Sequence, residues 1–125
     1  MRKSFFSPYN RNVFEDRRVR FLQEDARWVM ARERATYDVV VGDLFLPWRT
    51  GEGRLFTLEH FENVQRSLKP GGLFCQWLPM FQLTRAQFET IARTFREVFL
   101  DAFPVRGEFL RGASHHRSRR RTWLP

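Results

Sequence analysis

The sequence predicts an α/β domain in which a parallel sheet is flanked by helices. Apolar runs of strand length alternate along the chain with segments whose apolar residues recur at helical spacing. The connections between them are short and contain Gly, Pro or a helix-capping residue. This alternation is typical of βαβ units built on a parallel sheet. We expect right-handed crossovers to place the helices on the two faces of that sheet.

The first third of the chain predicts an irregular lead-in, a short strand and a short helix. Residues 1–15 show no sustained period of 2 or 3.6 and form the lead-in. In RVRFLQED, Val19 and Phe21 alternate with polar residues, as in a short strand that ends at Glu24 and Asp25. Residues 26–35, ARWVMARERA, consist of good helix formers. Their expected apolar side is Trp28, Val29 and Met30.

The centre of the chain predicts a strand, a helix and a second strand. YDVVVGDLF, residues 37–45, is the continuous apolar run expected where helices cover both faces of a parallel sheet. Thr57 is placed to cap the N-terminus of a helix with Glu59 in its first turn. KPGG, residues 69–72, ends that helix, and LFCQWL, residues 73–78, forms the next buried strand.

The last third predicts one long helix, a final strand and a tail. Thr84 and Gln87 have the spacing of a capping box. An apolar helical stripe follows them: Phe88, Ile91, Ala92, Phe95, Val98 and Phe99. DAFPV, residues 101–105, is the last expected strand. We therefore expect a domain over residues 16–105 and a basic, disordered tail over residues 106–125, where no period is visible.

The net charge of +8 lies in the two ends of the chain. Residues 1–20 carry six Lys or Arg against two acids, and residues 106–125 carry six Arg against one acid. The intervening residues are nearly balanced, with ten basic and eleven acidic side chains. HHRSRRR, residues 115–121, is able to neutralise phosphates, but a solvated terminus is the simpler interpretation. A small basic nucleic-acid-binding protein therefore stays open as an alternative.

The sequence predicts neither a membrane span nor a metal site. No window contains the roughly 18 uninterrupted apolar residues of a transmembrane helix, and the start of the chain does not resemble a secretory signal. The single cysteine, Cys75, excludes an internal disulfide and fits a reducing compartment, so we expect a cytoplasmic protein. The three histidines, His60, His115 and His116, have no Cys or acid at ligand spacing.

Two aspartates are the candidate chemical groups. Asp25 and Asp43 each follow a predicted strand, and ligands of open α/β sheets bind outside the carboxyl ends of the strands. Two carboxylates at one opening could hold a cation, accept hydrogen bonds from an amine or take a proton from a nucleophile. The alternative is that each Asp only caps the turn or helix that follows it. Gly42 favours a site at Asp43, because Gly inside an apolar strand often marks close approach of a ligand or a backbone.

Several segments in order resemble the spermidine synthase family, the polyamine aminopropyltransferases. They are EDAR (24–27), YDVVVGDLF (37–45), LFTLEHFENVQRSLKPGGLFCQW (55–77) and FREVF (95–99). The chain is most similar to bacterial spermidine synthase-like members, over about residues 16–105. The resemblance implies a Rossmann-like sheet of the class I methyltransferase type, of which this chain would hold the C-terminal part.

The resemblance also implies an activity and its residues. The family transfers an aminopropyl group from decarboxylated S-adenosylmethionine to putrescine, giving spermidine and methylthioadenosine. Asp43 matches the first acid of the family's D-x-x-D-P loop and would be the catalytic proton acceptor. Asp25, with Ala26, matches the motif that binds the adenine amino group, and Gln76 matches a glutamine near the polyamine. The adenosyl compound is a co-substrate, and no tightly bound cofactor is implied.

Two departures from the family pattern shape the prediction. Leu46 stands where the family has a second acid for the substrate amine, and Trp48 could offer a cation–π face instead. No Gly-rich cofactor loop precedes residue 16. We therefore expect an aminopropyltransferase-like fragment that lacks the N-terminal cofactor-loop half and is inactive alone. The alternative is a non-enzymatic remnant that binds a partner. The partner would be another chain, a separately encoded N-terminal half, or a second copy of this chain.

Overall fold

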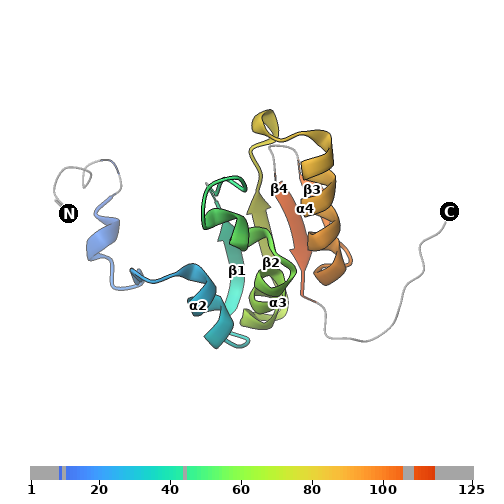
Figure 1. The fold of residues 1–125 in the computed structure, drawn as a ribbon. Coiled ribbons are helices and arrows are strands. Elements are labelled where there is room, and N and C mark those ends of the chain that lie inside the picture. Colours follow the sequence, from blue (N-terminus) through green and yellow to red (C-terminus); the bar gives the residue numbers. More distant parts are fainter. Residues whose placement is uncertain (1–8, 10, 44, 106–108, 115–125) are drawn as a thin grey trace.

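The structure is a computed structural model that describes residues 9, 11–43, 45–105 and 109–114. Its helices are α2 (Ala26–Arg32), α3 (Leu58–Ser67) and α4 (Arg85–Val98). Three short 3-10 helices accompany them: η1 (Val13–Glu15), η2 (Glu52–Phe56) and η3 (Met80–Gln82). The strands are β1 (Tyr37–Gly42), β2 (Leu68–Trp77), β3 (Phe103–Val105) and β4 (Phe109–Ala113). The predicted α/β class is confirmed (Figure 1).

The four strands form one mixed sheet in the order β1-β2-β4-β3. β1 and β2 are parallel, as predicted, and Val41 lies opposite Cys75. β4 runs antiparallel to both of its neighbours, so the expectation of a wholly parallel sheet is wrong. The reason is local: only three residues separate β3 from β4, and so short a connection joins antiparallel neighbours but not parallel ones.

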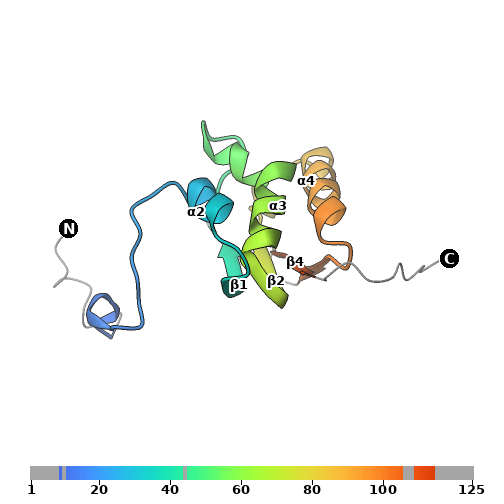
Figure 2. The ribbon, with the colours of Figure 1, turned by 90° about the horizontal axis from the view of Figure 1, so that it is seen from below.

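All three α-helices lie on one face of the sheet (Figure 2). The expectation that helices cover both faces is therefore wrong for the described residues. The connections from β1 to β2 and from β2 to β3 move in the same direction across the sheet. Right-handed crossovers that progress in one direction leave their helices, here α3 and α4, on the same face. In β1, Val39 and Val41 point to the other face and are 54% and 58% exposed.

Aromatic rings form the centre of the core between the sheet and the helices. Phe61 of α3 and Phe95 of α4 meet edge to face, with ring centroids 5.1 Å apart. Phe74 of β2 stacks on Phe95 at 5.3 Å, and Phe99 stacks on Phe95 at 4.8 Å. All four side chains are at most 1% exposed. The predicted stripe of α4 is thus confirmed as the face that packs on the sheet.

Both predicted helix caps are present. The Thr57 side chain accepts a hydrogen bond from the His60 backbone N–H at the start of α3. Thr84 and Gln87 form a reciprocal capping box at the start of α4. KPGG does follow the helix, but it also enters β2, where Gly71 takes a φ of 77° and the pairing with β1 slips. These Pro and Gly residues therefore form an irregularity within the strand.

The predicted strand near Val19 and Phe21 does not form. Residues 19–23 have no strand pairing, and Phe21 stacks instead on Phe14 of η1 at 4.7 Å. Figure 1 shows this segment leading away from the sheet. A strand needs a neighbour to pair with, and the described residues supply none beside this segment. In the helix that follows, Val29 is buried as predicted. Trp28 is 71% exposed, so the prediction that it belongs to the packed apolar side is wrong.

The C-terminal prediction is partly wrong. β3 confirms the last expected strand, but β4 lies inside the segment that was expected to be a disordered tail. β4 was hidden because its buried position opposite Phe74 is Gly112, which contributes no hydrophobic signal. The basic cluster at residues 115–121 lies outside the described residues.

The described residues contain no helix that is long and apolar enough to cross a lipid bilayer.

We predict that Gly112→Ala strongly destabilises the domain. A Cβ at this position would lie 2.3 Å from Phe99 Cβ and 3.0 Å from a ring atom of Phe95, so the core would have to shift. The expected loss of unfolding free energy is about 2 kcal/mol or more, measured by urea denaturation. Ala113→Val adds volume one residue later on the uncovered face and is expected to be nearly neutral. Equal stability of Gly112→Ala and the wild type would contradict this packing.

Candidate functional site

The carboxyl ends of β1 and β2 meet at one rim of the sheet. Their parallel register brings Gly42, the last residue of β1, opposite Gln76 of β2. Asp43 follows directly and is exposed. Among the described residues, no hydrogen bond or ion pair engages its carboxylate. The residue predicted as the catalytic carboxylate therefore lies at the rim where ligands of α/β sheets bind.

Gln76 joins the two strand ends. Its side chain is 1% exposed, and its Nε2 donates hydrogen bonds to the carbonyl oxygens of Gly42 at 3.3 Å and Trp77 at 3.0 Å. A Cβ on Gly42 would lie 2.5 Å from Gln76 Oε1. The glycine signal in the sequence thus reports close approach of a side chain, not of a ligand or another backbone. Gln76 supports the residue just before Asp43 and is itself shielded from solvent.

The loop after β1 is organised by a residue that the sequence prediction missed. Glu52 Oε2 accepts a hydrogen bond of 2.6 Å from the backbone N–H of Leu46, and its Oε1 lies 3.3 Å from Arg49 Nη1. Trp48, in the same loop, is 47% exposed. The only signal for Glu52 was its place in TGEG, which reads as a flexible tip. The carboxylate instead ties the two sides of the loop together.

Asp25 caps α2 and forms an ion pair. Its Oδ1 accepts from the Arg27 backbone N–H at 2.9 Å, and its Oδ2 lies 2.6 Å from Arg27 Nη2. These hydrogen bonds from Arg27 lower the pKa of Asp25 to about 2. The capping alternative is therefore present in the structure. A carboxylate has lone pairs for further donors, so the cap does not exclude contact with an amino group.

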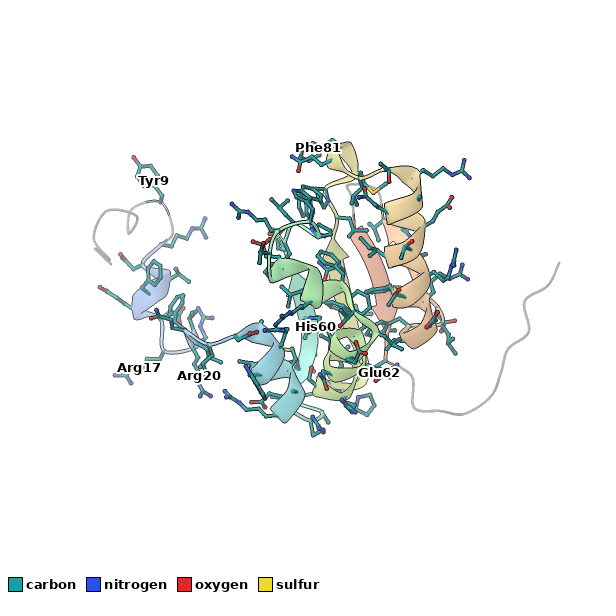
Figure 3. All side chains as sticks on the ribbon, in the orientation of Figure 1. Tyr9, Arg17, Arg20, His60, Glu62 and Phe81 are labelled. Carbon is teal, nitrogen blue, oxygen red and sulfur yellow. The ribbon has the colours of Figure 1, made fainter. Side chains whose placement is uncertain are left out.

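His60 is a second residue that the sequence prediction missed. It lies in the first turn of α3, on the side that faces α2 (Figure 3), and is 8% exposed. Its Nδ1 finds no hydrogen-bond partner among the described residues. Burial lowers the pKa of His60 to about 4; the charge of Arg27 also lowers it, while that of Asp25 raises it. The imidazole is therefore neutral at physiological pH.

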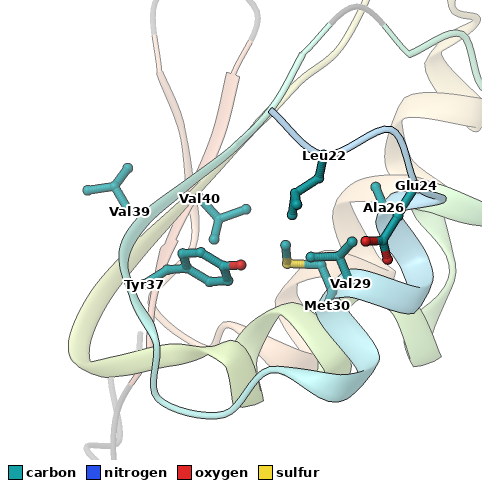
Figure 4. A pocket seen from close by; sticks show the side chains of 8 residues that line it. All are labelled: Leu22, Glu24, Ala26, Val29, Met30, Tyr37, Val39 and Val40. Atoms are coloured by element: carbon teal, nitrogen blue, oxygen red, sulfur yellow. The ribbon is translucent and has the colours of Figure 1, made fainter. Parts of the chain in front are cut away.

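A cavity of about 330 Å³ lies between α2, the segment before it and β1 (Figure 4). Its walls are mostly apolar, with Val29 and Met30 from α2 and Val39 and Val40 from β1. Ala26, a predicted adenosyl-binding residue, also lines it, whereas Asp25 and Asp43 do not. The expectation that the two aspartates share one opening therefore stays a prediction.

The predicted site residues offer two carboxylates and an indole. Within the described part of the chain, no group of three or more His, Cys, Asp or Glu side chains is placed to hold a metal ion. The available groups are an exposed carboxylate at Asp43, an arginine-paired carboxylate at Asp25 and an exposed indole at Trp48. Carboxylates and an aromatic face are groups that attract organic ammonium ions.

The sequence matches a known family over most of its length. The profile of the "Spermine/spermidine synthase domain" family matches residues 1–106, which includes the predicted lead-in. The chain is 28% identical over 96 residues to polyamine aminopropyltransferase 2 of Aquifex aeolicus and 31% identical over 93 residues to polyamine aminopropyltransferase 2 of Pseudomonas aeruginosa. It is 34% identical over 93 residues to the polyamine aminopropyltransferase of a Synechococcus strain. These matches cover 77%, 73% and 73% of this chain, but only 20%, 27% and 30% of the relatives.

Solved structures show the same fold. A spermidine synthase in complex with the transition state analogue AdoDATO superposes with a TM-score of 0.70 at 18% identity, over 88% of this chain and 41% of that protein. Spermidine synthase from Thermotoga maritima superposes with a TM-score of 0.64 at 15% identity, over 88% and 38%. The chain thus spans less than half of each of these proteins.

We predict that His60 makes stability depend on pH between about 6.5 and 4. Its pKa is lower in the folded chain than the ordinary 6.5, so the unfolded state binds the proton first as pH falls. Stability should be full above pH 6.5 and decline by up to about 3 kcal/mol as pH falls through 4. His60→Phe and His60→Leu should flatten this slope in urea titrations while His115 and His116 remain. An unchanged slope in both variants would contradict the burial of a neutral imidazole.

Proposed function

Because this chain belongs to the spermine/spermidine synthase family, we propose that it carries the amine-activating side of an aminopropyltransferase site. The reaction is transfer of an aminopropyl group from decarboxylated S-adenosylmethionine to putrescine or a related amine. The observation that carries the proposal is the exposed Asp43 carboxylate at the rim shared by β1 and β2.

Asp43 is proposed as the proton acceptor. An ammonium has no lone pair, so the acceptor amine must lose a proton before it attacks the carbon beside the sulfonium. The Asp43 carboxylate takes this proton, and the lone pair freed on nitrogen then forms the new C–N bond. The C–S bond breaks, and its electron pair stays on sulfur as methylthioadenosine leaves. The hydrogen bond from Gln76 to the Gly42 carbonyl supports this step by fixing the backbone from which Asp43 projects.

Asp25 and Ala26 are proposed to contact the adenosyl part of the co-substrate. Ala26 lines the cavity beside β1, and its small side chain leaves room for a planar base. The Asp25 carboxylate is ionised at neutral pH, and hydrogen bonds from Arg27 lower its pKa further, to about 2. It is therefore an acceptor for an amino group. No tightly bound cofactor is part of the proposal.

The acceptor end of the site differs from the family pattern. Leu46 replaces the acid expected to bind the second amine, and a leucine offers a cation neither charge nor a hydrogen bond. Trp48 is exposed in the same loop, and we propose that its indole face receives the distal ammonium instead. A cation–π contact at an exposed site contributes about 0.5–1 kcal/mol, less than an ion-paired hydrogen bond. Selectivity for putrescine is therefore expected to be weak.

The chain is proposed to be inactive by itself and active with added family sequence. It spans less than a third of the three curated relatives, so most of what they contain lies outside the match. We call the part of a relative that lies outside the match its complementary segment. We propose that such a segment completes the site. The expected location stays the cytoplasm, where a free thiol such as Cys75 remains reduced.

The proposal predicts that Asp43→Asn abolishes transfer in the completed protein. The chain is combined with the complementary segment of the Pseudomonas aeruginosa relative, and release of methylthioadenosine is measured with putrescine. Loss of the proton acceptor should lower the rate at least about 100-fold.

Asp38→Asn is the matched control for this experiment. Asp38 is also exposed on β1, but it pairs with Lys69 at 2.7 Å near the opposite end of the strand. This variant should keep wild-type turnover. Equal rates for Asp43→Asn and the wild type would remove Asp43 from its role, and a completed protein without any turnover would overturn the proposed activity.

A further inference from the structure

We propose that the free edge of β1 and the uncovered face of the sheet together form a docking surface for the complementary segment of a family relative. The segment would add a strand beside β1 and lay apolar helices across the uncovered face. This inference rests on the proposed function, since it names the surface through which that function would be completed.

The uncovered face is apolar and continuous across two strands. In the β1–β2 register, Val39 lies opposite Leu73 and Val41 opposite Cys75, and side chains of such pairs share a face. Trp77 follows two residues after Cys75 on the same face. The two valines are more than half exposed, and Leu73, Cys75 and Trp77 are half-buried. Valines in the middle of a strand are normally buried, so this exposure indicates a surface that packs against other protein.

The edge of β1 adds a second kind of binding site. β1 ends the strand order, so within the described residues only β2 pairs with it. An open edge presents unpaired N–H and C=O groups that an added strand can satisfy. The cavity of about 330 Å³ lies along this edge, and Leu22 forms its far side (Figure 4). The cavity therefore offers apolar contacts to the side chains of a strand that enters beside β1.

The comparisons support this choice of occupant. The solved spermidine synthase superposes on 88% of this chain but on only 41% of its own length, so a protein of this fold has enough additional chain to supply the strand and the helices. Residues 19–23, which have no strand pairing, support the same occupant. Val19, Phe21 and Leu22 are 36%, 57% and 40% exposed, as expected for a segment with strand pattern that lacks its neighbour.

The reactivity of the Cys75 thiol measures whether this surface is covered. It is the only cysteine of the chain and lies on the uncovered face. The tagged full chain is co-expressed with the complementary segment of the Aquifex, Pseudomonas or Synechococcus relative. Only those relatives are used whose complementary segment also binds their own matched segment when the two are expressed as separate chains. The rate of Cys75 modification by a maleimide is then compared in the complex and in the chain alone. We expect co-purification and at least about tenfold slower modification in the complex.

Val41→Asp and Leu100→Asp form a matched pair of variants. Both side chains are exposed, at 58% and 78%, so neither change should unfold the chain. Val41 lies on the proposed surface, whereas Leu100 follows Phe99, the C-cap residue of α4. Val41→Asp should weaken binding of the complementary segment at least about tenfold, and Leu100→Asp should leave it unchanged.

Several outcomes would overturn the inference. One is unchanged Cys75 reactivity with every reassembling relative, and another is equal binding by the two Asp variants. A chain that alone doubles in mass and protects Cys75 in a concentration-dependent way would identify a second copy as the occupant. Docking without methylthioadenosine release would leave this inference standing and overturn only the proposed activity.

Discussion

The parallel pairing of β1 with β2 is the constraint on which the rest of the structure depends. It brings the carboxyl ends of both strands to one rim, where Gly42 lies opposite Gln76. The buried Gln76 side chain donates a hydrogen bond to the Gly42 carbonyl oxygen, and this bond fixes the backbone just before Asp43. The same pairing directs Val40 and Phe74 to the helical side, where Phe74 stacks in the aromatic core. The position of the candidate site and the packing of the core therefore have a common origin.

Among the described residues, only one face of the sheet is covered by helices. The crossovers through α3 and α4 progress in one direction across the sheet, so both helices lie on one face, and α2 lies on the same face. The aromatic cluster of Phe61, Phe95 and Phe99 stabilises that side, while Val39 and Val41 gain little from burial. Burying a valine contributes about 1.5–3 kcal/mol, so the uncovered face represents a substantial stabilisation that only further protein could supply. The same additional segment of protein would therefore complete the site at the rim and cover the apolar face.

The sequence was most informative where local chemistry decides the structure. Thr57, Thr84 and the stripe through Phe95 predicted their helices and caps correctly, because capping and helical spacing act within a few residues. The prediction failed where distant segments decide. The alternation at Val19 and Phe21 describes a strand, but pairing depends on a neighbour that the described chain does not contain. Gly112 concealed β4, because a glycine packed under Phe99 shows no hydrophobic signal.

The candidate site shows the same division. The position of Asp43 followed from an apolar run ending in an acid, and the α/β rule for strand ends placed it at the rim. Glu52 and His60 were missed because their roles arise from the folded loop and from burial between helices. Gln76 was predicted from resemblance alone, and the structure gives it a supporting contact that the sequence does not reveal. The cavity beside β1 was not predicted either, because it is formed by segments that only the fold brings together, and neither Asp25 nor Asp43 lines it.

The most direct test of this account is the solvent exposure of valine methyl groups in the isolated chain, measured by NMR with a soluble paramagnetic probe. Val39 and Val41 should relax strongly, while Val64, which is 1% exposed in α3, should be protected. This contrast would establish a sheet with one covered face. Equal protection of Val41 and Val64 at low protein concentration would contradict it, because the face assigned to further protein would then already be covered.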